Sequence, residues 1–331
     1  MKAAIVTRYG PPEVLQVADV ADPVPADNEV RVRVHASTVS FGDRIIRAGP
    51  LFVRMLQGWR RPRVGILGVD FAGVVDAVGR NVTRFAPGDE VFGSRGDRFG
   101  AYAEFVCVAE NRWLSRKPHN MTLEEAATVF VGGACSLYFL RKAQIRPGDR
   151  VLVHGASGSL GTFAVQLAKH FGGHVTAVCS ARNAGLVRSL GADDVLDYAE
   201  APFTAGGRRY EVICDLLGKA GVADGLRALT PGGRYLLVGI PAGVGSILAA
   251  MVAGAWASLR GSLRFIFGAA VPDERDLEFL KDLIEAGELR TVISRRYVLA
   301  DIAEAHRYAD TGHKVGNVVV LIGSGASRSG G

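Results

Sequence analysis

Polar and apolar residues alternate in short runs through the first third of the chain, with turn residues between the runs. The clearest run is VRVRVHAS at 30–37; the others are KAAIV at 2–6, GVDFAGVVDAVG at 68–79, DEVFG at 89–93 and AYAEFVCV at 101–108. A period of two places successive side chains on opposite faces of a strand. This part of the chain is therefore predicted to be an antiparallel, barrel-like unit.

The pattern changes at MTLEEAATVF, where Thr122 and Glu125 have the spacing of a capping box ahead of an apolar run. Strand-like segments follow at 149–157, 174–180, 193–198, 210–218, 234–240 and 262–270, and helix-like segments at 161–172, 181–191 and 222–233. Helices between short apolar strands favour a parallel sheet with right-handed crossovers. After it, helices from 273 and a last strand in NVVVLIG are expected to return to the first domain.

A glycine-rich run, HGASGSLG at 154–161, lies between the apolar VLV and a helix-like segment. Its spacing, G-x-x-G-x-x-G, is a variant of the dinucleotide fingerprint, which needs a tight turn, close backbone approach and free N–H groups at a helix start. Glycines also serve ordinary strand-to-helix turns. The context favours a cofactor site made by Gly155, Ala156, Ser157, Gly158, Ser159, Leu160 and Gly161.

The end of the next strand indicates which nucleotide binds. An NAD site usually has an acidic residue about 20 residues past the loop, but here the sequence is Val-Cys-Ser-Ala-Arg-Asn at 178–183. The Ser180 hydroxyl and the Arg182 guanidinium suit a 2′-phosphate, so NADP is preferred over NAD. Alternatively, Ser180 caps the next helix and Arg182 points to solvent. Tyr198 is a further candidate for the same pocket.

The composition is that of a globular protein with room for two cores: 331 residues, 48% of them hydrophobic. Four cysteines without any C-x-x-C pair indicate buried thiols, not a disulfide framework or a four-thiolate zinc site. The opening MKAAIVTRYG lacks the features of a secretory signal, so a cytoplasmic location is expected.

The formal net charge is +6, and the segment RMLQGWRRPR at 54–63 concentrates Arg54, Arg60, Arg61 and Arg63. Elsewhere basic residues alternate with acidic ones and no nucleic-acid module is present, so no nucleic-acid partner is expected. The segment is interpreted as a solvated loop, or as a contact for an anionic partner or a membrane surface.

A second run has no charge over 25 residues, 235–259, which is long enough to cross a bilayer. It opens with the strand-like YLLVGI, and Pro241, Gly243 and Gly245 then interrupt it. No integral membrane segment is therefore expected. A buried strand followed by an apolar lid or subunit contact is favoured instead.

Taken in order, these segments resemble the medium-chain dehydrogenase/reductase superfamily, and within it the zinc-independent NADPH:quinone oxidoreductase-like branch. The resemblance covers nearly the whole chain and rests on AAIVTRYGPPEVLQV, GVDFAGVVDAVGRNVTRFAPGDEVFG, GAYAEFVCV, PGDRVLVHGASGSLGTFAVQLAK, CSARN, SLGADDVLDY and GNVVVLIG. It implies an α/β fold: a GroES-like, β-rich barrel catalytic domain at 1–121, completed by 272–331, and a Rossmann-type doubly wound parallel sheet at 122–271. A homodimer is implied by the resemblance only.

At the positions where zinc-dependent relatives have zinc ligands, this sequence has other residues. Such relatives carry a Cys in the segment matching Ser40 and a His matching Val69, and neither Ser nor Val can complete a nitrogen and sulfur site. We therefore expect NADP(H) and no zinc. Without a Lewis acid to activate an alcohol, an acceptor with its own electron sink is favoured. The resemblance implies hydride transfer from NADPH to a quinone or to the β-carbon of an enone.

The resemblance also implies further site residues. Ser40 and Asp43 match the segment near the nicotinamide and are the candidate catalytic residues, although many relatives have Asn in place of Ser40. Asp43 has an alternative role, holding its loop by accepting backbone hydrogen bonds. Tyr102 is expected to pack within its strand, and Cys135 is not expected to act as a nucleophile. The cofactor contacts carried over by position are Leu217, Gly218, Gly239, Ile240 and Asn317, each with a plain alternative as a strand-end turn.

Two other functions stay open from the sequence. One is a metal-free NADP-dependent alcohol or carbonyl dehydrogenase, or an enoyl reductase, which would share the same cofactor loop. The other is a catalytically inactive NADPH-binding regulatory protein that uses residues 54–63 as its contact surface.

Overall fold

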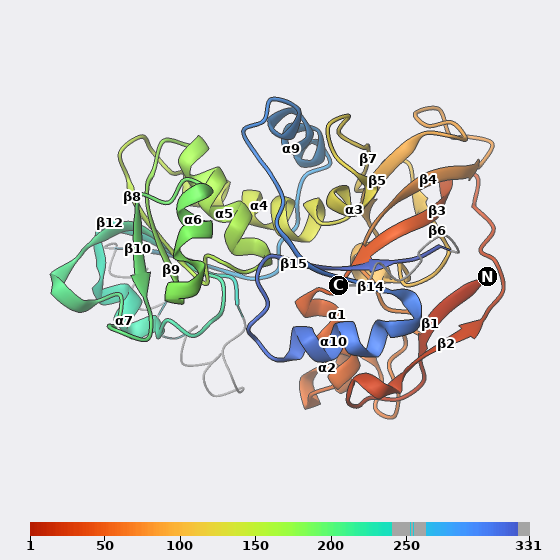
Figure 1. Ribbon diagram of the computed structural model, residues 1–331, viewed down its shortest axis with the longest axis horizontal. Helices are drawn as coiled ribbons and strands as arrows, with labels where there is room; N and C mark the ends of the chain where they lie inside the picture. The colour runs from red at the N-terminus through yellow and green to blue at the C-terminus, as the bar shows by residue number, and fades with distance from the viewer. Residues whose placement is uncertain (240–251, 253, 255–262, 324–331) are drawn as a thin grey trace. The chain divides into compact units, whose positions relative to one another are not determined.

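The computed structural model describes residues 1–239, 252, 254 and 263–323, drawn in colour in Figure 1. By its internal contacts the chain divides into two compact units. Unit 1 comprises Met1–Val131, Glu274–Gly287 and the chain from Thr291 onward, and unit 2 comprises Gly132–Asp273 and Glu288–Arg290.

Unit 1 is built on a seven-stranded sheet in the order β14-β15-β3-β4-β5-β7, with β6 also paired to β3. All pairs are antiparallel except β14 with β15, and a separate antiparallel pair joins β1 to β2. The strands are β1 Lys2–Val6, β2 Leu15–Asp19, β3 Glu29–Thr38, β4 Asp70–Val78, β5 Glu90–Ser94, β6 Phe105–Ala109, β7 Leu114–Arg116, β14 Ile293–Val298 and β15 Asn317–Leu321. The helices are α1 Phe41–Ala48, α2 Leu51–Gln57, α3 Leu123–Ala126, α9 Arg275–Glu285 and α10 Ile302–Asp310.

The alternation in the sequence produces this sheet directly. Along β3 the side chains of Val30, Val32 and Val34 are buried in the core, and the residues between them are less buried or exposed, which confirms the period-two prediction. The last strand, β15, pairs antiparallel with β3, with Val319 opposite Thr38. The end of the chain thus completes the sheet that its beginning starts.

Unit 2 holds a six-stranded parallel sheet in the order β10-β9-β8-β11-β12-β13. The strands are β8 Arg150–His154, β9 His174–Cys179, β10 Asp194–Asp197, β11 Tyr210–Asp215, β12 Leu229–Leu237 and β13 Leu263–Phe267. The helices with described bounds are α4 Cys135–Ala143, α5 Ser159–His170, α6 Ala184–Ser189 and α7 Val222–Arg227, with a π-helical stretch, Phe130–Ala134, leading into α4.

This strand order is that of the Rossmann fold. The chain moves outward from β8 to β10, then returns to the other side of β8 with β11. Since such crossovers are right-handed, reversing direction places the helices on opposite faces of the sheet. Val151, Leu152 and Val153 of β8 are accordingly fully buried. The predicted α/β fold, a doubly wound sheet with a β-rich unit, is confirmed.

Two sequence predictions are wrong in detail. The helix predicted over 222–233 ends at Arg227, and the Thr-Pro-Gly-Gly that looked like its stop lies inside β12, where the pairing with β11 is irregular. Pairing of Leu229 with Tyr210 outweighs the local turn preference. Tyr102 does not lie in a strand, because β6 begins only at Phe105.

Among the described residues, one helical run, Leu123–Ala143, is long and apolar enough to cross a membrane by length and composition. In its most apolar window 67% is buried inside the protein, as in the core helix of a folded domain. Most of the predicted lid or subunit contact after β12 lies outside the described residues.

Candidate functional site

The glycine-rich run connects the end of β8 to the start of α5. Gly155 has a positive φ of 86°, and the N–H groups of Gly155 and Ala156 both donate to the carbonyl oxygen of Val178 at 3.1 Å. The N-cap of α5 is Gly158, and no side chain caps it. The start of α5 thus lacks a capping side chain at its N-cap, and the positive end of the helix dipole there favours an anion such as a pyrophosphate.

Side chains would block this loop. A Cβ on Gly161 would lie 2.2 Å from the Gly155 carbonyl oxygen, so α5 can approach the loop only with glycine at that position. A Cβ on Gly155 would lie 2.7 Å from Leu217, and one on Gly239 2.2 Å from the Leu217 carbonyl carbon. The structure thus brings together the loop, Leu217 and Gly239, which the sequence assigned to one cofactor site.

A buried histidine–aspartate pair that the sequence analysis missed lies at the carboxyl edge of the sheet. His154 and Asp215 are the last residues of β8 and β11, the two strands between which the strand order reverses. The Nδ1 atom of His154 lies 3.1 Å from Oδ1 of Asp215. In open α/β sheets ligands bind outside this reversal point, so the pair lies where the cofactor loop belongs.

Asp215 holds the turn that follows β11. Its side chain is fully buried, and it accepts hydrogen bonds from the backbone N–H groups of Leu217, Gly218 and Ala220 at 2.9–3.2 Å and from the Tyr235 hydroxyl at 3.2 Å. Burial alone would raise the pKa of Asp215, but His154 and the backbone donors together lower it below the usual value. The carboxylate form is therefore stabilised. The sequence signal was an acid directly after the apolar strand VIC.

The candidate 2′-phosphate pocket lies at the ends of β9 and β10. Ser180 occupies the N-cap position of a short 3-10 turn, but its side chain makes no capping hydrogen bond. The alternative in which the Ser180 hydroxyl caps the next helix is thus not what the structure shows. Arg182 and Tyr198 are exposed, and in the described part of the chain Arg182 makes no ion pair.

Two neighbours of this pocket were not anticipated. The side-chain amide of Asn183 donates to the Ser157 hydroxyl at 3.0 Å, tying the pocket to the glycine loop. Asp197 lies opposite Cys179 in the β10–β9 pair, and its two oxygens accept the N–H groups of Ala181 and Ala199 at 3.0 and 2.9 Å. A carboxylate therefore does lie beside the pocket, contributed by β10 and not by β9.

The two candidate catalytic residues belong to unit 1 and bind each other. Ser40 and Asp43 form a reciprocal capping box at the start of α1: the Ser40 N–H and hydroxyl donate to Asp43, at 2.9 and 2.6 Å, and the Asp43 N–H donates to the hydroxyl at 3.2 Å. Asp43 also accepts the Gly68 N–H at 2.8 Å. These are the backbone-holding contacts of the alternative role described for Asp43. Burial raises the pKa of Asp43 to about 6, although these hydrogen bonds oppose the rise.

A polar cluster surrounds this box inside unit 1. The Tyr102 hydroxyl donates to the Thr38 carbonyl at 3.0 Å, and Nε2 of His306 lies 3.2 Å from the same hydroxyl. Oδ2 of Asp70 accepts from the Val131 N–H at 3.2 Å and from the Thr38 hydroxyl at 3.3 Å. Burial raises the pKa of Asp70 well above its usual value, which favours the neutral acid. Tyr102 is fully buried, as packing predicts, although it does not lie in a strand.

Two predicted cofactor contacts remain, Asn317 and Ile240. Asn317 is the first residue of β15 in unit 1, and its side-chain amide donates to the Val292 carbonyl at 3.2 Å. Ile240 lies outside the described residues. All four cysteines are free thiols; Cys135 is half-buried and the others are buried. Within the described ranges, no group of three or more His, Cys, Asp or Glu side chains could hold a metal ion.

Two family models match the chain. Residues 26–119 match the model described as "Alcohol dehydrogenase GroES-like domain", and residues 190–320 match the one described as "Zinc-binding dehydrogenase". The two models cover parts of both units.

Curated and solved proteins are similar over nearly the full length. A quinone oxidoreductase of Pseudomonas aeruginosa is 33% identical over 95% of this chain and 97% of that protein. The structure of the quinone oxidoreductase from Coxiella burnetii has a TM-score of 0.87 at 29% identity, covering 98% of this chain and 99% of that one. Escherichia coli quinone oxidoreductase complexed with NADPH has a TM-score of 0.82 at 25% identity, covering 97% of this chain and 100% of that chain.

Proposed function

Because the chain belongs to the medium-chain dehydrogenase/reductase superfamily, in its quinone oxidoreductase-like branch, we propose that it is an NADPH-dependent oxidoreductase. Its acceptor is a quinone or the activated C=C bond of an enone. The cofactor is inferred from similar proteins, one named an NAD(P)H oxidoreductase and one solved in complex with NADPH.

The observation that carries the proposal is the start of α5, which follows the turn at Gly155, contains Gly161 and has no capping side chain at its N-cap. The residues fit a dinucleotide because glycine at 161 lets α5 pack directly against the loop, and because the N-cap residue, Gly158, has no side chain to cap the helix start. When bound, the nicotinamide supplies the hydride. The Leu217–Gly218 turn, held by Asp215, and Gly239 would flank it.

The preference for NADPH rests on Ser180, Arg182 and Tyr198. A hydroxyl without a capping bond and a guanidinium without an ion pair in the described chain suit a phosphate dianion. Asp197 opposes this preference because its negative charge lies at the same strand ends. Both of its oxygens accept backbone N–H groups, one of them from Ala181, the residue before Arg182.

In unit 1 we assign Ser40 and Asp43 positioning roles. Asp43 is fully buried and orients the start of α1 against Gly68, which fixes the backbone of this part of unit 1. At the positions that match the zinc ligands of zinc-dependent relatives, this chain has Ser40 and Val69, whose side chains are poor zinc ligands. We therefore propose that hydride transfer proceeds without zinc.

The decisive experiment is an NADPH-consumption screen over benzoquinones, naphthoquinones, enones and simple ketones, with NADH in parallel and metal analysis of the same sample. We expect the protein to reduce quinones or enones with NADPH, and we expect the same preparation to contain far less than one zinc ion per chain. Oxidation of an alcohol with NADP would favour the dehydrogenase alternative. Tight NADPH binding without turnover of any acceptor would favour the regulatory alternative, and stoichiometric zinc would refute the metal-free step. A cytoplasmic location and a homodimer stay predictions.

A further inference from the structure

Unit 1 carries a patch that neither the core nor the proposed site explains, formed by α2 and the loop after it, residues 51–63. We name it the α2 patch. Of α2 only Val53 is buried in the core of unit 1. The large apolar side chains that the α2 patch exposes are Leu51, Met55 and Leu56 of the helix and Trp59 of the loop, with 61%, 73%, 71% and 65% of their surface exposed. Single exposed apolar residues are ordinary, but four between 51 and 59 form a patch.

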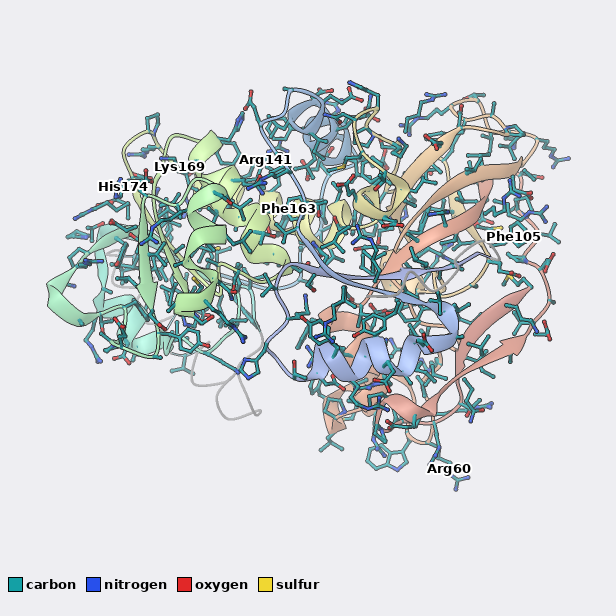
Figure 2. All side chains as sticks on the ribbon, viewed as in Figure 1. Arg60, Phe105, Arg141, Phe163, Lys169 and His174 are labelled. Atoms are coloured by element: carbon teal, nitrogen blue, oxygen red, sulfur yellow. The ribbon has the colours of Figure 1, made fainter. Side chains whose placement is uncertain are left out.

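Cations surround these apolar groups without counter-charges. From 44 to 69 the sequence contains no Asp or Glu but six arginines. Arg44 and Arg47 are paired with Asp310. In the part of the chain that the structure describes, no carboxylate pairs with Arg60, Arg61 or Arg63, which are exposed, and Figure 2 shows Arg60 projecting outward at the edge of the protein.

The loop is held in place, so the patch is a defined surface. The Tyr9 hydroxyl donates to the Gly58 carbonyl at 2.6 Å, and the Arg63 N–H donates to the Gln57 carbonyl at 2.7 Å. Gly58 has a φ of 118°, and a Cβ there would lie 2.7 Å from the Arg61 carbonyl oxygen. The turn that presents Trp59 beside the arginines therefore requires glycine.

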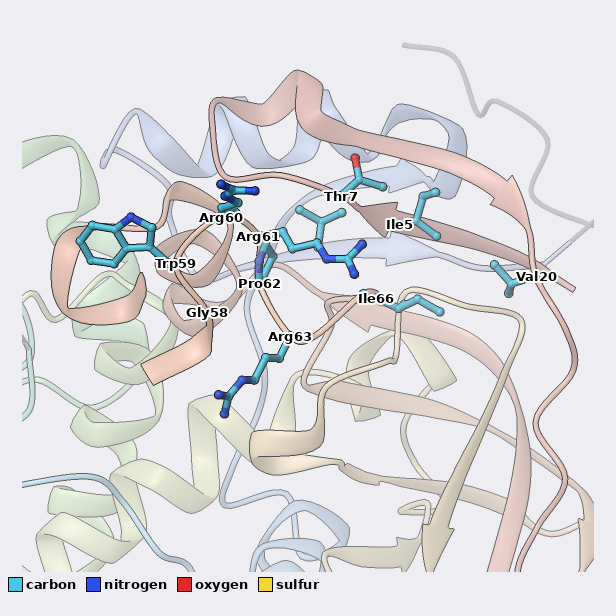
Figure 3. Close-up of a pocket in the computed structure, with 12 residues that line it drawn as sticks. Ile5, Thr7, Val20, Gly58, Trp59, Arg60, Arg61, Pro62, Arg63 and Ile66 are labelled. Carbon is cyan, nitrogen blue, oxygen red and sulfur yellow. The ribbon is translucent and has the colours of Figure 1, made fainter. Parts of the chain in front are cut away.

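Next to this loop lies an open cavity of about 740 Å³, lined on one side by the loop and on the other by Ile5, Thr7, Val20 and Ile66. Figure 3 shows Trp59 at one end, Val20 at the other, and Arg61 and Arg63 leaving the loop in different directions. The cavity gives an anionic headgroup room beside the guanidinium groups. Its apolar rim suits the upper part of an acyl chain.

We propose that the α2 patch docks on the surface of an anionic lipid bilayer, with Met55, Leu56 and Trp59 entering the interface and Arg60, Arg61 and Arg63 facing lipid phosphates. Exposed Leu, Met and Trp beside Arg, at low net hydrophobicity, are the composition of interfacial membrane anchors. The absence of acidic residues from 44 to 69 is the charge complementarity that an anionic surface demands. This docking goes beyond the proposed oxidoreductase function and does not depend on it.

The test uses the full chain and two kinds of vesicle, phosphatidylcholine alone and phosphatidylcholine mixed with phosphatidylglycerol. In flotation assays we expect binding to the mixed vesicles, little binding to the neutral ones, and weakening of the bound fraction as salt is raised. The Trp59 emission should move to shorter wavelength with mixed vesicles, and this shift should be lost in Trp59→Phe. Equal binding to both vesicle types, or none to either, would overturn the proposal.

Two double variants and one control separate the contributions. Arg60→Glu with Arg61→Glu should lower partition into mixed vesicles at least on the order of 30-fold, since each arginine near such a surface is worth about five-fold and the new carboxylates are repelled. Met55→Ser with Leu56→Ser should lower it about ten-fold. The control, Arg146→Glu with Arg188→Glu, reverses two exposed charges in unit 2 and so lowers the formal net charge of the chain by the same amount, from +6 to +2. It should change partition less than about three-fold.

The outcomes distinguish this proposal from its rivals. An equal loss in the control would mean adsorption by overall charge, and the α2 patch would have no special role. Concentration-dependent self-association without vesicles, abolished by the Met55 and Leu56 exchanges, would mean that a second copy of the chain covers the patch. NADPH binding by each variant reports folding, and absence of NADPH binding in the unaltered protein would refute the proposed function while leaving the vesicle result to stand.

Discussion

Exchanging Asp215 for asparagine tests whether the buried carboxylate holds the turn after β11. Oδ1 accepts from His154, Leu217 and Gly218, and Oδ2 accepts from Ala220 and Tyr235. An amide keeps one acceptor oxygen, so in either orientation its NH₂ group faces at least two of these donors. The exchange is nearly isosteric, and the change therefore isolates hydrogen bonding and charge from packing.

The magnitude follows from the number of donors affected. Each buried donor left without an acceptor costs about 1–3 kcal/mol, and Asp215 has no exposed surface through which water could replace it. Allowing for partial relaxation, we expect Asp215→Asn to lower the free energy of unfolding of unit 2 by about 2–4 kcal/mol. For a unit of this size that is a fall in Tm of roughly 5–15 °C.

The assay is thermal unfolding with and without NADPH, with Asp193→Asn as the matched control. Asp193 is a partly exposed aspartate that pairs with Lys169 at 2.9 Å and accepts one backbone N–H, that of Val175, at 2.7 Å. Its exchange should therefore cost less than that of Asp215, which accepts three backbone N–H groups without solvent access. Asp215→Asn should also weaken NADPH binding, because the Leu217–Gly218 turn contacts the glycine loop. A Tm within about 1 °C of the unaltered protein, or a fall no larger than that of the control, would refute the reasoning.

The same carboxylate predicts a pH dependence. The folded-state pKa of Asp215 is lowered, so its contribution to stability is present above the unfolded-state pKa of about 3.9 and is lost as pH falls through the folded-state value. Unfolding measured from neutral pH down to about pH 3 should therefore show a steeper acid loss in the unaltered protein than in Asp215→Asn. Parallel curves would contradict this sign.

Three further exchanges test the cofactor site. In fluorescence titrations, Arg182→Ala should weaken NADPH binding about ten-fold to hundred-fold and leave the affinity for NADH unchanged. The control, Arg188→Ala, replaces an exposed arginine of α6 and should change neither affinity. An unaltered ratio of the two affinities in Arg182→Ala would rule out the proposed phosphate contact. Asp197→Asn should shift the ratio of affinities toward NADPH, because it removes a negative charge beside the pocket, and a shift toward NADH would contradict that placement. Gly161→Ala should abolish NADPH binding, since its Cβ would lie 2.2 Å from a backbone oxygen of the loop. Its control, Gly185→Ala, lies in a helix with open space around it, and it should bind NADPH normally and raise stability by about 0.5–1 kcal/mol. Equal NADPH binding by the two alanine variants would contradict the close approach of α5 to the loop.

Features encoded by neighbouring residues could be predicted from the sequence. The alternation along 29–38 specifies a strand with one buried face, because only one register places every valine in the core. The capping box at Thr122 and Glu125 begins a helix where its spacing indicates, and both of its reciprocal bonds are formed. The glycine run could be assigned to a strand-to-helix turn because both flanking elements are apolar and close in sequence.

Features that depend on distant residues could not be predicted in this way. His154 and Asp215 are 61 positions apart, and only the parallel pairing of β8 with β11 places them side by side. Asp197 escaped notice for the same reason: it follows the pocket by 16 positions and reaches it through the β10–β9 pair. The Ser40–Asp43 box differs, since its serine-x-x-aspartate spacing is local and could have been recognised as a helix start.

The two units use buried carboxylates in the same way. Asp43 collects the N–H groups of Ser40 and Gly68, and Asp215 collects those of the turn after β11; both side chains are fully buried. Without exposed surface, both carboxylates bind N–H groups of their own unit. Under the proposed hydride transfer we therefore expect both acids to position backbone and not to exchange protons with the acceptor, and small errors in such positioning are costly. The kinetic consequence is that replacing either acid by its amide should alter affinity and turnover at every pH, without moving the midpoint of a pH–rate profile.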